Sequence, residues 1–167
     1  IRATTGQDVS LDEIPMDDPG TFEMLSQGGT VGVFQLEGGG MTRNLMELRP
    51  TSVHDLVAMV ALYRPGPMEQ IPNYIRGKNN PHKVTYLHPT LEPILVDTYG
   101  VIVDQEQVLQ ILQKMAGYTL GRADIVRKAI GKKKRDLMEQ EEPRFIQGCI
   151  ANGLDKNQAK TLWDLIQ

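Results

Sequence analysis

Cysteine and aromatic residues are scarce in this sequence of 167 residues, and it holds no long apolar run. A single cysteine, Cys149, excludes an internal disulfide and is typical of proteins of the reducing cytoplasm. Aromatic residues make up 5% of the chain and hydrophobic residues 40%, which favours aliphatic helical packing over a β-sandwich. No apolar stretch approaches the ~18 residues that a bilayer-crossing helix needs. We therefore expect a soluble, cytoplasmic protein with no membrane partner.

Clusters of residues that hold metal ions or perform catalysis are also missing from the sequence. The histidines lack cysteine partners and HxxxH spacing, so a zinc site is not predicted. Two acidic pairs, at 17–18 and 104–106, stand where helices are expected to begin, and acids there complement the helix dipole. Two-metal phosphoryl transfer needs carboxylates that converge on ions ~4 Å apart. The sequence therefore predicts no catalytic residue and no metal ligand in this chain.

Charge is distributed unevenly along the chain, although the net charge is only −3. Residues 1–40 hold seven acids and one basic residue, Arg2, whereas 121–135 hold seven basic residues and one acid, Asp124. Such asymmetry is typical of a local anion site on an acidic scaffold. A solvated helical face with no ligand has the same composition, so the pattern supports both interpretations. The basic residues are Arg122, Arg127, Lys128, Lys132, Lys133, Lys134 and Arg135.

Apolar periodicity and capping residues predict a mainly α fold, a multi-helix assembly with one or two short β-strands. Asp18, Ser52, Thr119 and Asp155 stand where helix N-caps are expected. The predicted helices cover approximately residues 19–27, 41–48, 53–63, 68–75, 104–115, 120–130, 137–150 and 155–167, with an interruption or restart at Pro143. The two candidate strands are Val31–Leu36, bounded by turn residues and predicted to be buried, and Tyr99–Val103.

The predicted helix from Leu120 to Ile130 carries the leading candidate site residues, Arg127 and Lys128. At 100° per residue the helix has one apolar face, from which Arg127 and Lys128 point away. A buried apolar face would present these two cations rigidly to phosphates. The tail that follows Gly131 begins with Lys132, a further candidate, but cations at a helix C-terminus also simply complement the helix dipole. The apolar face is predicted to comprise Ile125, Val126, Ala129 and Ile130.

Two further segments have features of an anion site. Gly39 and Gly40 precede a predicted helix, and their unobstructed N–H groups could contact a phosphate, although a glycine triplet without a P-loop lysine also serves as a tight turn. Arg64 is followed by Pro65 and Pro67, which stiffen the loop that presents it. Phosphate recognition and pairing with one of the many acids are equally compatible with Arg64.

Several segments taken together resemble a known family. They occur in the family's order and at its approximate spacing, over essentially all of residues 12–167. They are Gly32–Glu37 (GVFQLE) with Gly40-Met41, Ala58–Pro67 (AMVALYRPGP), Thr98-Tyr99-Gly100, Gln105–Val108 (QEQV), Gly117–Gly121 (GYTLG) with Ala123-Asp124, and Arg127–Lys134 (RKAIGKKK). The chain resembles the C-family replicative DNA polymerases, specifically the alpha subunit of bacterial DNA polymerase III.

The resemblance implies that this chain is a piece of a larger, template-directed DNA polymerase, a nucleotidyltransferase of DNA replication. Residues 1–30 would be an acidic lead-in with a first short helix following the absent palm, and 31–167 a fingers-domain fragment truncated at its C-terminal end. The catalytic aspartates of the family lie in the palm, so this chain alone is expected to be inactive. The complete enzyme is expected to use Mg²⁺, whereas this fragment is expected to bind no cofactor.

The resemblance also implies roles and partners for the candidate residues. Arg127, Lys128, Arg64 and Lys132 would face the triphosphate of the incoming deoxynucleotide. The expected partners are primer-template DNA, the incoming dNTP and the remainder of the polymerase chain, with the sliding clamp and other replicase subunits contacting regions outside this fragment. The protein would be cytoplasmic and nucleoid-associated. Many relatives have a second arginine where Lys128 stands, serine at Gly38 and an aromatic residue at Asp104, so contacts by those side chains are changed here.

Two functions of other classes fit the residues when the resemblance is left aside. A non-catalytic nucleic-acid-binding helical module would use the 121–135 segment to hold any phosphate backbone, and its affinity would fall steeply with salt. A protein-interaction scaffold with solvated charges would bind neither DNA nor nucleotide. The response of binding to salt and to nucleotide discriminates among the three.

Overall fold

The computed structural model describes residues 2–8 and 10–167, and it is mainly helical, as predicted. Two compact units are present, one ending at Arg64 and the other comprising Pro65–Gln167. The predicted division into residues 1–30 and 31–167 stays a prediction.

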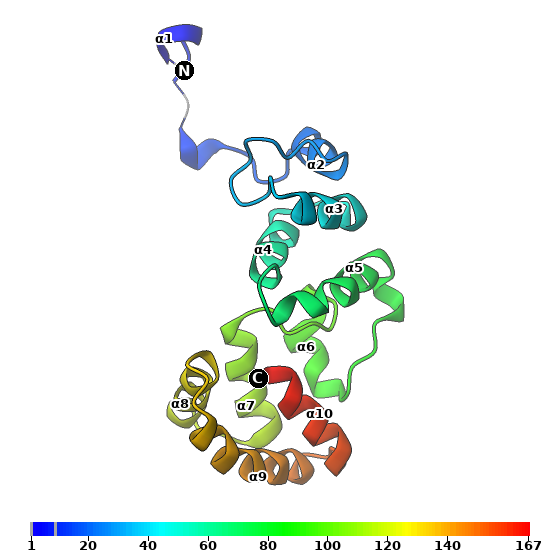
Figure 1. The fold of residues 1–167 in the computed structure, drawn as a ribbon, viewed down its shortest axis with the longest axis vertical. Coiled ribbons are helices and arrows are strands. Elements are labelled where there is room, and N and C mark those ends of the chain that lie inside the picture. The colour runs from blue at the N-terminus through cyan, green and yellow to red at the C-terminus, as the bar shows by residue number, and fades with distance from the viewer. Residues whose placement is uncertain (1, 9) are drawn as a thin grey trace. The chain divides into compact units, whose positions relative to one another are not determined.

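The first unit consists of helices joined by short turns. They are α1 (Arg2–Thr5), a 3₁₀ turn at Leu11–Glu13, α2 (Pro19–Ser26), α3 (Gly39–Leu48) and α4 (Val53–Leu62). α2 packs against α3 (Figure 1). The apolar side chains that this unit buries most completely are Leu25, Leu45, Leu48, Met59 and Leu62.

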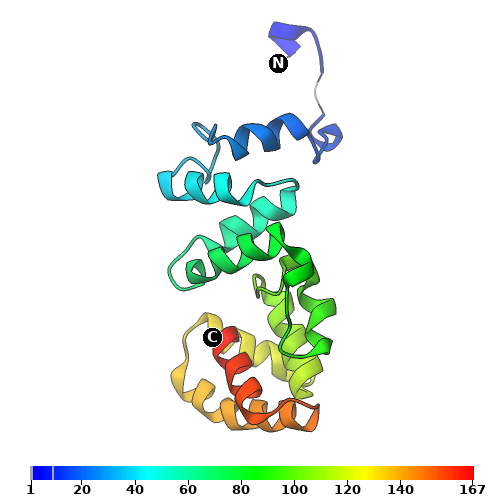
Figure 2. The same cartoon turned by 90° about the vertical axis from the view of Figure 1, so that its right-hand side faces the viewer.

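The second unit begins with short helical segments and continues with four longer helices. The short segments are a 3₁₀ turn at Pro67–Gln70, α5 (Ile71–Asn79), 3₁₀ turns at Pro81–Lys83, Pro89–Leu91 and Val96–Thr98, and α6 (Glu92–Leu95). The longer helices are α7 (Gln105–Ala116), α8 (Leu120–Gly131), α9 (Arg135–Ala151) and α10 (Lys156–Ile166). α7 packs against both α8 and α9, and α10 packs against α9 (Figures 1 and 2).

The core of the second unit lies among these four helices and α6. Phe145 and Trp163 are fully buried with ring centroids 5.0 Å apart, which joins α9 to α10. Ile111 and Leu112 lie four and three positions before Met115 on α7, and all three are fully buried. Burial of such side chains is the main favourable contribution to folding, at about 1.5–3 kcal/mol each.

The helix starts follow from local side-chain chemistry, and the predicted N-caps are confirmed. Asp18 accepts a hydrogen bond from the backbone N–H of Thr21 at 2.7 Å, and Thr119 caps α8. Reciprocal capping boxes begin α4 at Ser52, α7 at Asp104 and α10 at Asp155. Each box satisfies backbone donors that a helix N-terminus otherwise leaves unpaired.

The two predicted strands are wrong, because no strand occurs in residues 2–8 or 10–167. Residues 31–36 form turns, in which Gly32 and Gln35 have φ values of 77° and 64°. Such left-handed backbone interrupts an extended run. The burial expected for this run is also wrong, because Val31 is 94% exposed and Phe34 85%, and Leu36 alone is buried. The second predicted strand fails for the same reason, since its first residue, Tyr99, has φ 53°.

α9 runs without a break from Arg135 to Ala151 and contains Pro143, where an interruption or restart was predicted. Proline inside a helix removes one backbone hydrogen bond and is unfavourable. Packing of α9 against α7, α8 and α10 offsets that cost.

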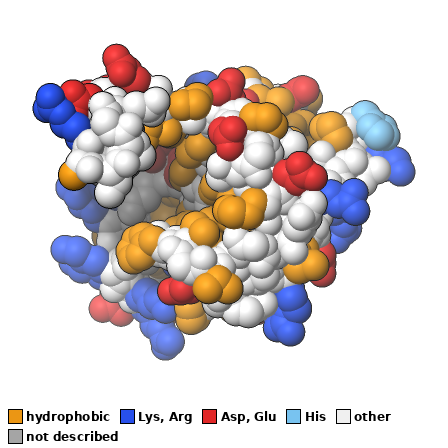
Figure 3. Space-filling view, turned by 90° about the horizontal axis from the view of Figure 1, so that it is seen from above, with side chains coloured by type: hydrophobic (Ala, Val, Ile, Leu, Met, Phe, Trp, Pro, Cys, Tyr) orange, Lys and Arg blue, Asp and Glu red, His pale blue; other side chains and the backbone are white. Residues whose placement is uncertain are grey.

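Large apolar side chains reach solvent at several positions outside these cores. The face drawn in Figure 3 shows apolar side chains among scattered acidic and basic ones, with no broad area of one charge. Met16 and Val57, for example, are 67% and 60% exposed.

No helix among the described residues is long and apolar enough to cross a membrane.

Candidate functional site

The buried face of α8 differs by one residue from the predicted face. Ala123, Val126 and Ala129 are buried and Ile130 is half-buried, whereas Ile125 is 48% exposed. At about 100° per residue, Ala123 lies within about 60° of Val126, whereas Ile125 lies about 100° from Val126 on its far side. Ile125 therefore lies off the buried face of α8, and the prediction that it belongs to this face is wrong.

Arg127 stands at the edge of this buried face and is held by two polar partners. Its guanidinium donates to Oδ1 of Asp124, from Nη2 at 2.7 Å and from Nε at 3.2 Å. Nη1 donates to the side-chain oxygen of Gln105 in the first turn of α7. The side chain is 20% exposed, so Arg127 joins α8 to the start of α7 and still reaches solvent.

Lys128 is more exposed and shares the same carboxylate. Its Nζ lies 2.7 Å from Oδ2 of Asp124, and its side chain is 59% exposed. The hydrogen bonds from Lys128 and Arg127 lower the pKa of the Asp124 carboxyl below its ordinary value. Two cations one position apart in the sequence therefore converge on a single oxyanion group at the surface.

The basic tail that follows α8 is exposed to solvent along its whole length. Lys132, Lys133, Lys134 and Arg135 are all exposed, and none of them pairs with a carboxylate among the described residues. The backbone is ordered by hydrogen bonds from Lys132 N to Lys128 O and from Lys134 N to Ala129 O, at 3.1 and 3.0 Å. These four cations form a flank of positive charge beside Arg127 and Lys128 in sequence.

Glu141 is a buried acid that the sequence reasoning missed. It is 2% exposed, accepts a hydrogen bond from the Tyr118 hydroxyl at 2.9 Å and forms an ion pair with Arg122. The guanidinium of Arg144 lies 5.1 Å from the centre of the Tyr118 ring. Glu141 occupies the same helical face as buried Met138 and Phe145, so an acid within an apolar periodicity is the signal that could have found it. It ties α9 to the first turn of α8.

Gly40 has a packing role, because an added Cβ would collide with the hydroxyl of Tyr63. An added Cβ at Gly39 would meet nothing within 4 Å. Both residues lie in the first turn of α3, which Gly38 precedes as N-cap. The backbone contact with an anion that was predicted for Gly39 and Gly40 stays a prediction.

Arg64 is exposed and directly follows the C-cap of α4, where its backbone N–H donates to Leu62 O at 2.8 Å. It is the last residue of the first unit, whereas Arg127, Lys128 and Lys132 belong to the second. The structure therefore brings Arg127 and Lys128 together on one carboxylate, whereas Arg64 belongs to the other unit.

Groups of side chains that could hold a metal ion are absent from the described residues. Asp104 and Glu106, the paired acids of the sequence, are exposed at the start of α7, where Asp104 serves as the N-cap.

The described residues form helices and turns, and α8 with the tail that follows it carries a cluster of basic side chains. Comparison with known proteins specifies the family. The sequence model of the bacterial DNA polymerase III alpha subunit finger domain matches residues 1–153. The chain belongs to this family.

Relatives with high identity align along almost the whole chain. The DNA polymerase III subunit alpha of Halalkalibacterium halodurans is 51% identical over 166 residues, which are 99% of this chain and 15% of that protein. The DNA polymerase III subunit alpha of Staphylococcus aureus strain Mu50 is 48% identical over 166 residues, which are 99% of this chain and 16% of that protein. The chain thus spans about one sixth of the length of these relatives.

Proposed function

We propose that this chain is the part of a template-directed replicative DNA polymerase that positions the incoming deoxynucleotide, with Arg127 and Lys128 contacting its phosphates. The observation that carries the proposal is the convergence of both cations on one carboxylate, at 2.7 Å each. A phosphate group could replace that carboxylate, because both present oxyanions at hydrogen-bonding distance. Family membership supports the polymerase role.

The chemistry assigned to the pair is positioning and electrostatic stabilisation. In phosphoryl transfer, negative charge spreads over the transferring and leaving oxygens, and prepositioned Arg and Lys stabilise it. Gln105 holds Nη1 of Arg127 independently of Asp124, so the guanidinium stays in place when a phosphate replaces the carboxylate, which reduces the ordering cost of binding. Lys128 supplies a point charge where a planar guanidinium would make two parallel bonds.

Arg64, Lys132, Gly39 and Gly40 are secondary candidates for phosphate contact. Primer-template DNA, the incoming dNTP and the rest of the polymerase are the proposed partners, and the clamp and other replicase subunits would contact other regions of the parent protein. The parent polymerase would use Mg²⁺ held by carboxylates outside this chain, in the bacterial cytoplasm close to the nucleoid.

The proposal is tested by Arg127→Ala in the parent polymerase. Loss of a charge-assisted hydrogen bond costs about 1.5–3 kcal/mol, so kcat/KM for nucleotide should fall roughly ten- to hundredfold while primer-template affinity is unchanged. Arg127→Lys should retain part of the activity. The matched control is Lys114→Ala, which removes an exposed cation from α7. Normal incorporation accompanied by a lower melting temperature would show that Arg127 is only a structural ion-pair residue.

A second candidate function, non-specific binding of a nucleic-acid backbone, is favoured by the exposed tail from Lys132 to Arg135. Under the first proposal only a few phosphates are contacted, and each adds about one unit to the slope of log affinity against log salt, so any DNA binding by the chain should have a shallow slope. Primer extension with the isolated chain, Mg²⁺ and all four triphosphates should give no product. A steep salt slope with no effect of nucleotide would favour the second function over the first.

A further inference from the structure

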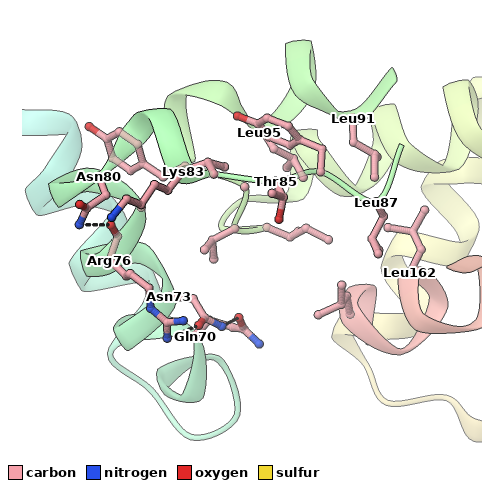
Figure 4. A pocket seen from close by; sticks show the side chains of 18 residues that line it. Gln70, Asn73, Arg76, Asn80, Lys83, Thr85, Leu87, Leu91, Leu95 and Leu162 are labelled. Carbon is pink, nitrogen blue, oxygen red and sulfur yellow. Dashed lines mark hydrogen bonds between the residues drawn. The ribbon is translucent and has the colours of Figure 1, made fainter. Parts of the chain in front are cut away.

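A groove of about 470 Å³ lies on the second unit, and none of the candidate phosphate-binding residues lines it. Residues from α5, the 84–87 segment, the 99–102 segment and α10 surround it (Figure 4). The 84–87 segment is fastened to α10 by a hydrogen bond from Gln158 Nε2 to Leu87 O at 3.2 Å. Cavities of about 300–1,000 Å³ are typical of ligand sites.

One end of the groove is polar and positively charged. Arg76 and Lys83 line it together with Asn73 and Asn80, and no acidic residue is among its lining residues. Arg76 donates to the side-chain oxygen of Asn73 at 3.1 Å, a neutral partner. Neither Arg76 nor Lys83 pairs with a carboxylate in the described part of the chain. This end is therefore complementary to an anion.

The opposite end is apolar and aliphatic. Leu91, Leu95 and Leu162 form its buried floor, with exposed fractions of 2%, 4% and 1%. Leu87 is half-buried, and Leu165 is 45% exposed at the edge. Figure 4 shows Leu87 and Leu162 across the groove from Asn73 and Arg76, with Thr85 between them. An aliphatic side chain entering here would cover surface that now faces water.

A basic end beside an aliphatic end favours one class of anionic ligand over another. Single-stranded nucleic acid binds by stacking its bases on aromatic faces. Two tyrosines line the groove: the Tyr99 ring packs against Tyr74 at 5.3 Å in an edge-on arrangement, and Tyr86 is half-buried against the apolar core. The apolar end itself is formed by leucines and is aliphatic. An acidic peptide with neighbouring aliphatic side chains matches both ends, because Arg and Lys bind carboxylates and the leucines accept an apolar side chain.

We propose that this groove is a docking site for a short acidic–aliphatic peptide segment of a partner protein. A carboxylate of the peptide binds Arg76 and Lys83, and an aliphatic side chain two or three positions away packs between Leu87 and Leu165. The groove contains neither Arg127 nor Lys128, so its test is separate from the test of the phosphate-binding proposal.

The experiment is selection of a displayed library of random twelve-residue peptides on the purified 167-residue chain. The expected result is a consensus with at least one Asp or Glu next to Leu, Ile or Val. A synthetic peptide of that consensus should bind at least tenfold more weakly to the Arg76→Glu/Lys83→Glu variant and to Leu165→Asp. The matched control is Lys114→Glu, which reverses an exposed charge that does not line the groove and should leave affinity unchanged.

Folding of each variant is checked separately from its affinity for the peptide. All variants should show the circular dichroism and thermal unfolding of the original chain, because Arg76, Lys83 and Leu165 are exposed. The proposal is overturned if no consensus emerges, if the consensus is basic, or if the groove variants bind the peptide normally. It is also overturned if oligodeoxythymidylate binds the groove in place of the peptide. If the parent polymerase does not bind the peptide, other parts of the polymerase cover the groove. That outcome also overturns the docking proposal.

Discussion

Asp124 determines how the cations of α8 are held, since its two carboxylate oxygens accept from Arg127 and from Lys128. Its pKa is lowered in the folded chain by these contacts. A carboxyl with a lowered pKa contributes stability that is present above the ordinary carboxyl pKa of about 4 and is lost as the pH falls through the lower folded value.

We therefore predict that Asp124→Asn lowers the stability of the chain near pH 7 and has no effect at the acid end of the titration. Thermal unfolding of both proteins as a function of pH measures the difference between them. Asp136→Asn, at an exposed acid in the first turn of α9, is the control for removal of one negative charge. A difference in melting temperature that stays constant with pH would mean that the ionised carboxylate of Asp124 does not stabilise the fold.

Burial, not residue type, should decide the cost of truncating isoleucines. Ile111 is fully buried on α7, whereas Ile125 is 48% exposed on α8. We predict that Ile111→Ala costs about 2–5 kcal/mol of unfolding free energy, because it leaves a cavity. Ile125→Ala should cost no more than about 0.5 kcal/mol, as at other exposed sites. Denaturant unfolding of the two variants is the measurement, and equal costs would contradict the burial described for α8.

At the scale of the helix, the crossing of α7 and α9 depends on Gly148. A Cβ added there would collide with the backbone carbonyl of Ala116, at the end of α7. Backbone atoms cannot move aside as the tip of a side chain can, so the two helices would have to separate. Asn152 makes a further link across the same crossing by donating to Met115 O at 3.1 Å.

We predict that Gly148→Ala destabilises the second unit by about 1–3 kcal/mol through overpacking. The matched variant is Gly121→Ala in α8, where an added Cβ meets nothing within 4 Å. Alanine is the better helix former, so Gly121→Ala should be neutral or stabilising by up to about 1 kcal/mol. Thermal unfolding of the pair checks both signs, and a stable Gly148→Ala variant would mean that α7 and α9 do not cross this closely.

At the scale of the whole molecule, the chain consists of two units with separate internal contacts. The main apolar cluster, which runs from Leu91 to Ile166, lies wholly within the second unit. We predict that residues 65–167 expressed alone keep their helical content and unfold cooperatively. Circular dichroism during thermal unfolding is the measurement. A molten, non-cooperative transition would show that the second unit depends on residues 1–64 for its packing.

The sequence by itself determined the longer helices and their capped starts, because caps and helical periodicity depend on residues three or four positions apart, but it did not predict the four-residue helices α1 and α6. Asp18, Ser52 and Thr119 cap helices as their patterns predict. The ordered motifs also placed the chain in its polymerase family. The two strands could not be excluded in the same way, because a short apolar run does not by itself show whether its backbone is extended or turned.

Only the tertiary structure decided how distant residues meet. Glu141 on α9 forms a hydrogen bond with Tyr118 and an ion pair with Arg122 on α8. Arg76 and Leu165, which are far apart in the sequence, line the same groove. The physical reason is that burial and ion pairing depend on which surfaces pack together, and a local sequence pattern does not show which distant residue will become a neighbour.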